Sequence, residues 1–443
     1  MWVVGVLAAC SAAAVVLILR YHDKGSLWAT WAAAVVAAPS LVPLIRRPES
    51  PEAVAVADAL ASAVADQWSR AAADRRLVSP APVPVRWSLT GLPVAGPVHA
   101  AVTSRRFGPV PGTSAVTESA LRAGGGRADL HAVYAGLGSG RLVVVGEPGA
   151  GKSGAAVLLV LDALAHREGV GAPNRDRVPV PVLFTLHGWD PVAEPFENWL
   201  IGRLAGTYPS LFAGRTGRRV AAGLLAGGRV SVVLDGLDEM SPTLQPVALR
   251  ALSDQARVRV VLLTRTTELV AAAGYLVDAA ALELHPIDHL SAATYLERAL
   301  DGPAPARWDS LLDHLRDNLD GPVVAALSTP LMLSLVRDTY RAGDDLTALL
   351  ALATADRADV EGHLLDRVLP AAYAPRPGQP APRYPLARAE LALRYLATQL
   401  SRRGTRDLVW WLIPTWAPRW PRTLATTAVA CFLFGFATGL GSV

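Results

Sequence analysis

Cysteine is nearly absent from the sequence, which has only Cys10 and Cys431 in 443 residues, both inside apolar stretches. Neither has a C-x-x-C or histidine-rich partner, so a disulfide framework and a zinc site are excluded. Lysine is just as scarce, with Lys24 and Lys152 alone, and arginine therefore carries almost all of the positive charge. The formal net charge is only +4, and no basic run is long enough to follow a phosphate backbone. We therefore expect no nucleic-acid partner.

Charge is missing altogether from two long runs near the N-terminus. Residues 2–19 and 27–45 contain no charged side chain, and a pair of arginines follows the second run. Each run is about long enough to cross ~30 Å of hydrocarbon as a helix. We therefore predict a transmembrane helical hairpin over residues 1–47. Two alternatives stay open: a secretory signal, although no basic residue precedes Cys10, and a shallow interfacial second segment, because that run contains two prolines.

The C-terminal end repeats this pattern. Tryptophans and arginines at positions 416–422 lead into residues 423–443, which carry no charge. Such anchors ahead of an apolar run are typical of a membrane entry, and arginines on the side of the preceding domain place that domain in the cytoplasm. We predict one or more membrane segments within residues 408–443, and hence a multi-pass protein of the cell membrane. Since the run continues to Val443, either a shortened product or a tail that ends just across the bilayer fits the sequence.

One of the two lysines lies in a glycine-rich loop. The β-branched run 141–145 is followed directly by Gly146, Glu147, Pro148, Gly149, Ala150, Gly151, Lys152 and Ser153, and then by the apolar stretch 155–164. This is the pattern G-x-x-x-x-G-K-[ST] between a predicted strand and a predicted helix. In that pattern backbone N–H groups surround the phosphates, Lys152 meets the β- and γ-phosphate oxygens, and Ser153 binds Mg²⁺. The sequence therefore predicts a nucleotide and Mg²⁺ as ligands.

A second predicted strand, 229–234, ends in the acidic segment Asp235-Gly236-Leu237-Asp238-Glu239. Its apolar run is typical of a buried parallel strand. Asp235, at the end of the strand, is expected to contact Mg²⁺. Asp238 or Glu239 is expected to orient or deprotonate the attacking water.

Two further predicted strands end in polar residues. The strand 258–263 is followed by Thr264 and Arg265, at the edge of an open α/β sheet where ligands bind. Arg265 is a candidate for sensing the γ-phosphate, and a surface arginine in a salt bridge is the alternative. The strand 178–186 leads to His187 and Trp189, which we expect to be structural.

The segments GEPGAGKS, VVLDGLDE and VVLLTRT together resemble the NACHT family of STAND-type P-loop NTPases. The acidic segment from Asp235 to Glu239 fits the family pattern without a departure, and the resemblance is strong over about residues 130–300. It continues weakly around Pro330, which is similar to a family proline that approaches the adenine, and over 391–411, which is similar to a winged-helix segment. The resemblance implies a switch that holds ADP in a closed monomer, exchanges it for ATP on an unknown trigger, self-associates and hydrolyses ATP slowly. It also suggests a role in bacterial defence, although neither a repeat array nor a known effector domain is recognisable in the sequence.

We expect an α/β fold whose parallel-sheet P-loop core is followed by an all-α, winged-helix-like region, with transmembrane helices at both ends. Apolar residues at spacings of three and four predict a helix over 51–76, a proline-rich connector follows at 79–84, and three glycines at 124–126 suggest a hinge. Two more helices are predicted over 291–300 and 308–319. The predicted domains are a membrane hairpin (1–47), a helical linker or connector (48–127), the NTPase core (128–290), a helical and winged-helix-like region (291–407) and C-terminal membrane segments (408–443).

Three functions compete at this point. The first is a membrane-anchored signalling NTPase, favoured by the acidic segment. The second is a motor or transport ATPase, although no LSGGQ signature is present and no apolar span interrupts the core between Lys152 and Asp235. The third is a membrane scaffold that uses bound nucleotide only for folding.

Overall fold

The computed structural model describes residues 51–272, 274–300, 305–341, 343–375 and 380–403, with residues 408, 410, 413–416 and 427. The predicted membrane hairpin (1–47) lies outside the described residues, and so does nearly all of the predicted C-terminal membrane segment (408–443). None of the helices in the described ranges combines the length and the apolarity that crossing a bilayer requires.

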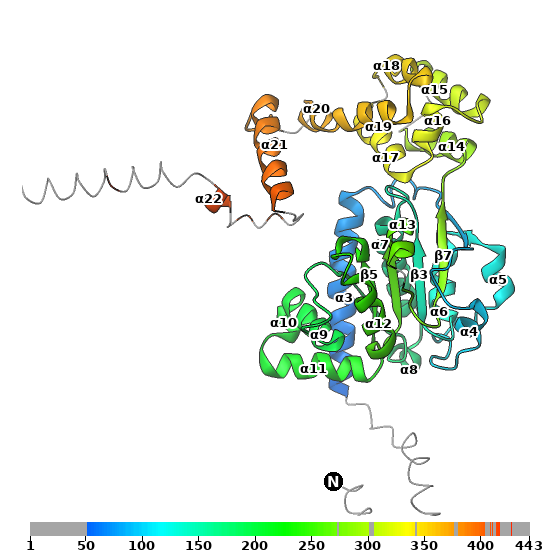
Figure 1. Cartoon of the computed structure of the whole chain (residues 1–443), viewed down its shortest axis with the longest axis vertical. Coiled ribbons are helices and arrows are strands. Elements are labelled where there is room, and N and C mark those ends of the chain that lie inside the picture. Colours follow the sequence, from blue (N-terminus) through cyan, green and yellow to red (C-terminus); the bar gives the residue numbers. More distant parts are fainter. Residues whose placement is uncertain are drawn as a thin grey trace, which may run out of the picture.

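The protein is of the α/β class, as predicted, and is built on a seven-stranded, mostly parallel sheet (Figure 1). The order of the strands is β2-β1-β7-β3-β6-β5-β4. The five parallel strands are β3 (Arg141–Val145), β4 (Val180–Thr185), β5 (Val230–Asp235), β6 (Val260–Thr264) and β7 (Ala280–His285). The four parallel strands predicted from the sequence are confirmed to within two residues at each end. β7 adds a fifth.

The order of the strands positions the site. β6 lies between β3 and β5, with Val145 opposite Thr264 and Leu234 opposite Leu262. Because the carboxyl ends of parallel strands meet at one edge, the loops after β3, β6 and β5 lie side by side. We call this the carboxyl edge of the sheet, and the opposite one the amino edge.

The segment predicted as a helical linker, 48–127, is part of the sheet. Its long helix α3 (Pro51–Asp74) is confirmed, and the stripe of Ala57, Leu60 and Val64 is buried against α7 and β4. β1 (Arg86–Leu89) then pairs antiparallel with β7, and β2 (Gly125–Gly126) pairs with β1. Short helices α4 (Val98–Thr103) and α5 (Glu118–Ala123) complete the segment.

The three glycines expected to form a hinge are instead packed against Trp87. The indole Nε1 of Trp87 donates a hydrogen bond to the carbonyl oxygen of Gly126 at 2.7 Å. A Cβ on Gly124 would lie 2.7 Å from the Trp87 carbonyl oxygen, and one on Gly125 would lie 2.8 Å from the Trp87 ring. The glycines therefore serve a close approach of two strands.

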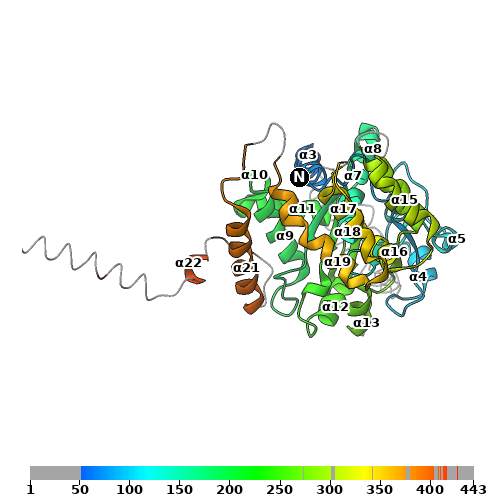
Figure 2. The ribbon, with the colours of Figure 1, turned by 90° about the horizontal axis from the view of Figure 1, so that it is seen from above.

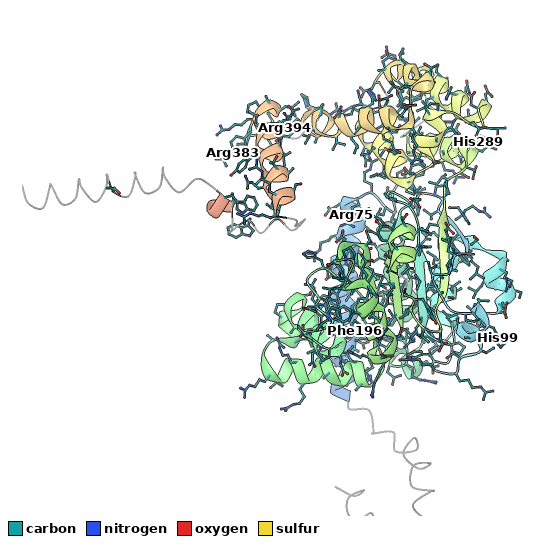
Figure 3. The ribbon with its side chains drawn as sticks, viewed as in Figure 1. Arg75, His99, Phe196, His289, Arg383 and Arg394 are labelled. Carbon is teal, nitrogen blue, oxygen red and sulfur yellow. The ribbon has the colours of Figure 1, made fainter. Side chains whose placement is uncertain are left out.

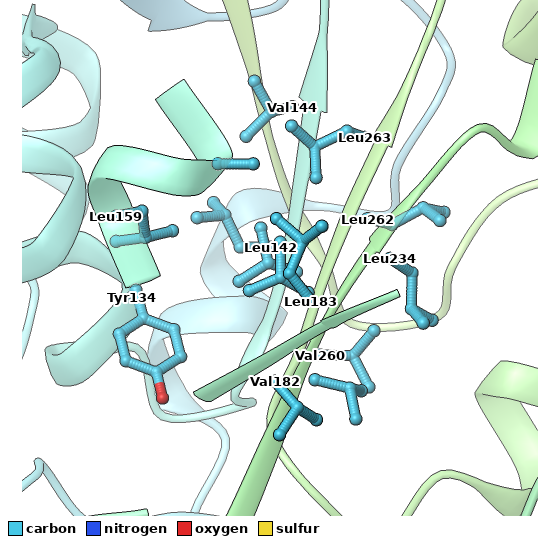
Figure 4. Close-up of a cluster of buried hydrophobic side chains, with 14 of the residues drawn as sticks. Tyr134, Leu142, Val144, Leu159, Val182, Leu183, Leu234, Val260, Leu262 and Leu263 are labelled. Atoms are coloured by element: carbon cyan, nitrogen blue, oxygen red, sulfur yellow. The ribbon is translucent and has the colours of Figure 1, made fainter. Parts of the chain in front are cut away.

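Helices surround the sheet and bury its apolar faces. Figure 4 shows buried valine and leucine side chains on both faces of β3, β4, β5 and β6, with Tyr134 and Leu159 of two helices beside one face. The Tyr134 hydroxyl is hydrogen-bonded to the Ser231 hydroxyl at 2.6 Å, which satisfies both groups inside this core. The helices are α6 (Leu130–Gly136), α7 (Lys152–Gly169), α8 (Ala172–Arg175), α9 (Phe196–Thr207), α10 (Pro209–Phe212), α11 (Gly214–Ala226), α12 (Gln245–Gln255) and α13 (Thr266–Ala271).

A second hydrophobic core, from Ile287 to Leu364, belongs to a helical unit above the carboxyl edge (Figures 1 and 2). The helices predicted over 291–300 and 308–319 are confirmed as α14 and α15. Over the described part of 291–407 only helices are present, so no strand of a wing is seen there. The helices are α14 (His289–Ala299), α15 (Ala306–Asp317), α16 (Pro322–Leu327), α17 (Pro330–Thr339), α18 (Thr347–Leu350), α19 (Arg357–Asp366), α20 (Val368–Tyr373), α21 (Leu386–Arg402) and the short α22 (Ile413–Trp416).

Candidate functional site

The predicted P-loop joins β3 to α7 at the carboxyl edge. Gly149 and Gly151 have φ angles of 80° and 85°, which a side chain would disfavour. Lys152 is the first residue of α7, and no side chain caps this end of the helix. The helix N-terminus therefore presents free N–H groups and a partial positive charge, the arrangement that binds phosphate.

The Lys152 ammonium is held over this loop. Its Nζ donates hydrogen bonds to the carbonyl oxygens of Gly146 at 2.6 Å and Glu147 at 3.0 Å. Burial lowers the pKa of Lys152, and the carboxylates of Asp238 and Asp235 oppose that shift. A partly desolvated ammonium binds phosphate oxygens more strongly than one in bulk water does.

The P-loop and the acidic strand meet through Ser153 and Asp235. The Ser153 hydroxyl donates a hydrogen bond to Asp235 Oδ2 at 2.6 Å. Burial raises the pKa of Asp235, and the hydrogen bond from Ser153 opposes that shift. A hydroxyl beside a partly desolvated carboxylate is a pair of hard oxygen ligands, so these two residues fit Mg²⁺ that also binds nucleotide phosphates. Among the described residues, no group of three or more His, Cys, Asp or Glu side chains could hold a metal ion by itself. At Ser153 and Asp235, nucleotide phosphates would supply the further ligands.

The other two acids lie in a short 3₁₀ turn, Leu237–Glu239. Gly236 precedes the turn with a φ of 82°, and a Cβ there would lie 3.1 Å from Glu239 Oε2. Glu239 is therefore folded back over Gly236 while remaining exposed to solvent. Asp238 points the other way and is paired with Arg265.

Arg265 is engaged in ion pairs in this structure. Its Nε lies 2.9 Å from Asp238 Oδ2 and its Nη1 lies 3.4 Å from Glu268 Oε1. The salt-bridge alternative left open by the sequence is therefore the arrangement seen. Beside it, the hydroxyl of Thr264 is fully buried without a hydrogen-bond partner. Such a hydroxyl is costly unless a ligand or water satisfies it, which fits a site that is completed by a bound group.

Pro330 lies against the P-loop. It begins α17 of the helical unit, and a Cβ on Gly151 would lie 3.0 Å from its Cγ. The neighbouring Leu331 donates its backbone N–H to the carbonyl oxygen of Gly149 at 3.3 Å. The helical unit therefore touches the phosphate-binding loop directly.

A cavity of about 390 Å³ opens between the helical unit and the P-loop end of the sheet domain. Lys152 and Ser153 form one end of it, and Pro330 and Leu331 form one wall. The volume lies within the usual range for small-molecule sites, and the mixture of apolar walls with a few polar groups is typical of them.

Another part of the lining was not recognised in the sequence. It includes Arg76, Leu77, Val83 and Val85, from the stretch between α3 and β1. The prolines predicted a connector over 79–84, but no motif indicated that this stretch folds back over the P-loop. By contrast, the structural role expected for Trp189 is confirmed, since its ring is buried against Phe196.

Neither a family model nor a curated protein matches this chain. Among solved structures, one match is a chain from work on the structural basis of katanin self-assembly. It is 16% identical, with a TM-score of 0.27, over 51% of this chain and 71% of that one. At this score the similarity carries no argument about fold or function.

Proposed function

We propose that the chain binds ATP or ADP with Mg²⁺ at the P-loop and acts as a membrane-anchored switch of the NACHT type. The observation that carries this proposal is the position of Ser153, which is hydrogen-bonded to Asp235 at 2.6 Å while the adjoining loop touches Pro330. A nucleotide in the adjacent cavity would contact both the sheet and the helical unit.

Each residue has a distinct task in this proposal. Lys152 and the N-terminus of α7 bind the phosphates, and Ser153 and Asp235 hold Mg²⁺, which neutralises charge on the phosphate oxygens. Glu239 is exposed beside Asp235 and is placed to orient or deprotonate water. Asp238 acts through Arg265, since the pair is closed at 2.9 Å.

The contact between the units supports a switch over a simple hydrolase. A ligand shifts an equilibrium only when it binds two arrangements with different affinity. Because Pro330 and Leu331 pack on Gly151 and Gly149, a change in the loop on losing the γ-phosphate is felt first by α17. Self-association in the ATP state and slow hydrolysis that resets the switch complete the proposal, with bacterial defence as its suggested setting.

The test compares nucleotide content and particle size of the detergent-purified full chain with ADP and with ATP. Lys152→Ala is expected to weaken nucleotide binding on the order of 100-fold, because a charge-assisted contact to phosphate is lost. Lys24→Ala removes the only other lysine and is the matched control. Glu239→Gln is expected to keep nucleotide bound, slow its turnover and increase the larger ATP-dependent assembly.

Glu239→Gln is a cleaner variant than Asp238→Asn, because the latter also releases Arg265 from its ion pair. Equal loss of binding in all three site variants would contradict the roles assigned here. Steady ATP turnover by a particle whose size is the same with ADP and with ATP would favour a motor function over a switch. Tightly bound nucleotide with neither turnover nor assembly would leave a scaffold.

A further inference from the structure

Arginines that are dispersed in the sequence gather at the amino edge of the sheet. Arg141 begins β3, and Arg229 and Arg259 directly precede β5 and β6. All three are buried. Arg141 and Arg259 donate hydrogen bonds to backbone carbonyl oxygens of nearby helices and loops at this edge.

Outside these buried groups lies an exposed set, which we call the basic edge: Arg105, Arg177, Arg215, Arg218, Arg219 and Arg257. Arg177 and Arg257 lie in the loops before β4 and β6, and all of the others except Arg105 lie on α11, which leads into β5. The loop of Arg105 follows α4 and is tied to the loop before β3, because the Phe107 N–H donates to the Gly138 carbonyl oxygen at 2.9 Å. None has a carboxylate within ion-pair distance among the residues described.

Carboxylates are few in the same loops. The stretches 104–110, 136–140 and 213–229 contain none, although they contain six arginines. The carboxylates of Asp176, Asp254 and Asp278 are nearby, and their charges act on the buried Arg167 and Arg141. The basic edge is therefore locally unbalanced in a chain whose overall net charge is only +4.

Two exposed apolar side chains lie at this edge as well. Tyr275 and Val277, in the loop before β7, are 51% and 44% exposed. The carbonyl oxygen of Val277 accepts a hydrogen bond from Arg141 Nη1 at 2.7 Å, which fixes the loop beside the amino end of β3. Aromatic and apolar residues beside arginines are the composition of a protein surface at a lipid interface.

The first described helix, α3, begins at the amino edge of the sheet, as its ion pair with the end of α7 shows. α7 begins at the P-loop and runs for 18 residues, about 27 Å, to the amino edge. There Arg167, whose side chain is 2% exposed, pairs with Asp58 near the start of α3. Figure 1 shows α3 beginning at the same pole as α8 and α11, opposite the helical unit. The 50 residues before Pro51, with their two uncharged runs, therefore join the domain at the basic edge.

We propose that the basic edge docks on an anionic phospholipid surface and holds the nucleotide site facing away from the bilayer. This rests on the membrane attachment in the proposed function. A lipid surface is favoured over a nucleic acid because α3, which follows the two uncharged N-terminal runs in the sequence, begins at this pole. Arginine near an anionic leaflet strengthens such docking roughly 5-fold per residue.

The test uses the full chain in nanodiscs of phosphatidylcholine, with or without about 30 mol% phosphatidylglycerol. A fluorophore on Thr216→Cys, in a Cys10→Ser/Cys431→Ser background, reports the exposed surface of α11 between the arginines. The same label on Ser241→Cys reports the carboxyl edge. A nitroxide on lipid headgroups is the quencher.

We expect strong quenching at position 216 in anionic discs, little at 241, and loss of the difference in about 1 M NaCl, where the Debye length is roughly 3 Å. Arg215→Gln/Arg218→Gln/Arg219→Gln is expected to lower the ratio of docked to undocked protein on the order of 100-fold. The matched control removes three exposed arginines elsewhere, with Arg70→Gln/Arg250→Gln/Arg298→Gln, and is expected to leave quenching unchanged.

The other outcomes overturn either the docking proposal alone or the membrane attachment as well. Quenching at 216 that ignores phosphatidylglycerol, or that survives the triple substitution, overturns the proposal while membrane attachment stands. A chain that enters no disc at all overturns both. Tight binding of a single-stranded oligonucleotide that the triple substitution abolishes, with no lipid dependence, assigns the basic edge to nucleic acid instead. Nucleotide binding is measured in parallel, so a failure of the switch itself is separated from a failure of docking.

Discussion

Arg337 of α17 is the residue whose replacement tests the junction between the two units most sharply. Its side chain is 3% exposed. Nη1 donates hydrogen bonds to the Arg76 carbonyl oxygen at 2.9 Å and to the Tyr295 hydroxyl at 2.6 Å. Nη2 reaches the Arg75 carbonyl oxygen at 3.5 Å. Figure 3 labels Arg75 where the end of α3 meets the helical unit, so one guanidinium ties the two residues that follow α3 to that unit.

The cost of Arg337→Met can be worked from these contacts. Methionine keeps much of the stem but none of the donors, so two close hydrogen bonds from a charged group are lost, each worth about 1.5–3 kcal/mol. Asp338 loses a partner as well but retains Arg76 at 3.2 Å. We expect a loss of about 3–6 kcal/mol, which lowers the melting temperature by roughly 6–24 °C if the units unfold together.

The assay is thermal and urea unfolding of the full chain, followed by tryptophan fluorescence. Tyr295→Phe removes only the acceptor hydroxyl and is expected to cost about 1 kcal/mol. The double variant measures the coupling between the two residues. Arg341→Met is the control, because that exposed arginine donates to Pro375 at 3.0 Å and is expected to cost under about 1 kcal/mol. An Arg337→Met variant that unfolds like the control would refute the reasoning.

Two further changes test the site. Gly151→Ala combines a φ of 85° with a Cβ 3.0 Å from Pro330, and it is expected to lower the free energy of unfolding by about 1–3 kcal/mol. Gly154→Ala, whose Cβ would make an ordinary contact at 3.7 Å, is expected to be neutral or stabilising. Equal effects of the two substitutions would show that Pro330 is not seated on the loop. Because burial raises the pKa of Asp235, the folded protein holds that proton more tightly, and stability falls as pH rises above 4. Asp235→Asn is therefore expected to raise the melting temperature at pH 7 without nucleotide, flatten its pH dependence and reduce stabilisation by Mg²⁺-nucleotide; a lower melting temperature at pH 7 would contradict this.

The elements whose geometry depends on neighbouring residues in the chain could be predicted from the sequence. The strand at 141–145, the loop that follows it and the acidic strand end at Asp235 are contiguous patterns whose geometry depends on their own residues. The same holds for α3, because its apolar stripe repeats over six turns. β1 and β2 were missed because a four-residue strand and two glycines have no periodicity, and their pairing depends on Trp87, which is 39 residues from Gly126.

The wall of the cavity and the basic edge were missed for a related reason. Val83 and Val85 reach the P-loop only because the chain reverses direction after α3. No residue pattern in the connector predicts that reversal. The arginines of the basic edge lie far apart in the sequence, from Arg105 to Arg257, and only the parallel sheet brings them to one edge. The absence of a basic run, from which we expected no nucleic-acid partner, is a property of neighbours along the chain and does not report which arginines are neighbours in space.

The two edges of the sheet separate the two proposals. Lys152, Ser153 and Asp235 lie at the carboxyl edge, and the arginines of α11 lie at the amino edge, so the sets share no residue. α3 links both edges, because Arg337 bonds to Arg76 just after its C-terminal end and Arg167 pairs with Asp58 in its N-terminal part. A change confined to one edge is therefore expected to leave the other intact unless α3 carries it. Quenching at position 216 measured with ADP and with ATP reports whether it does, because a basic edge that responds to nucleotide in the wild type but not in Arg337→Met requires that helix.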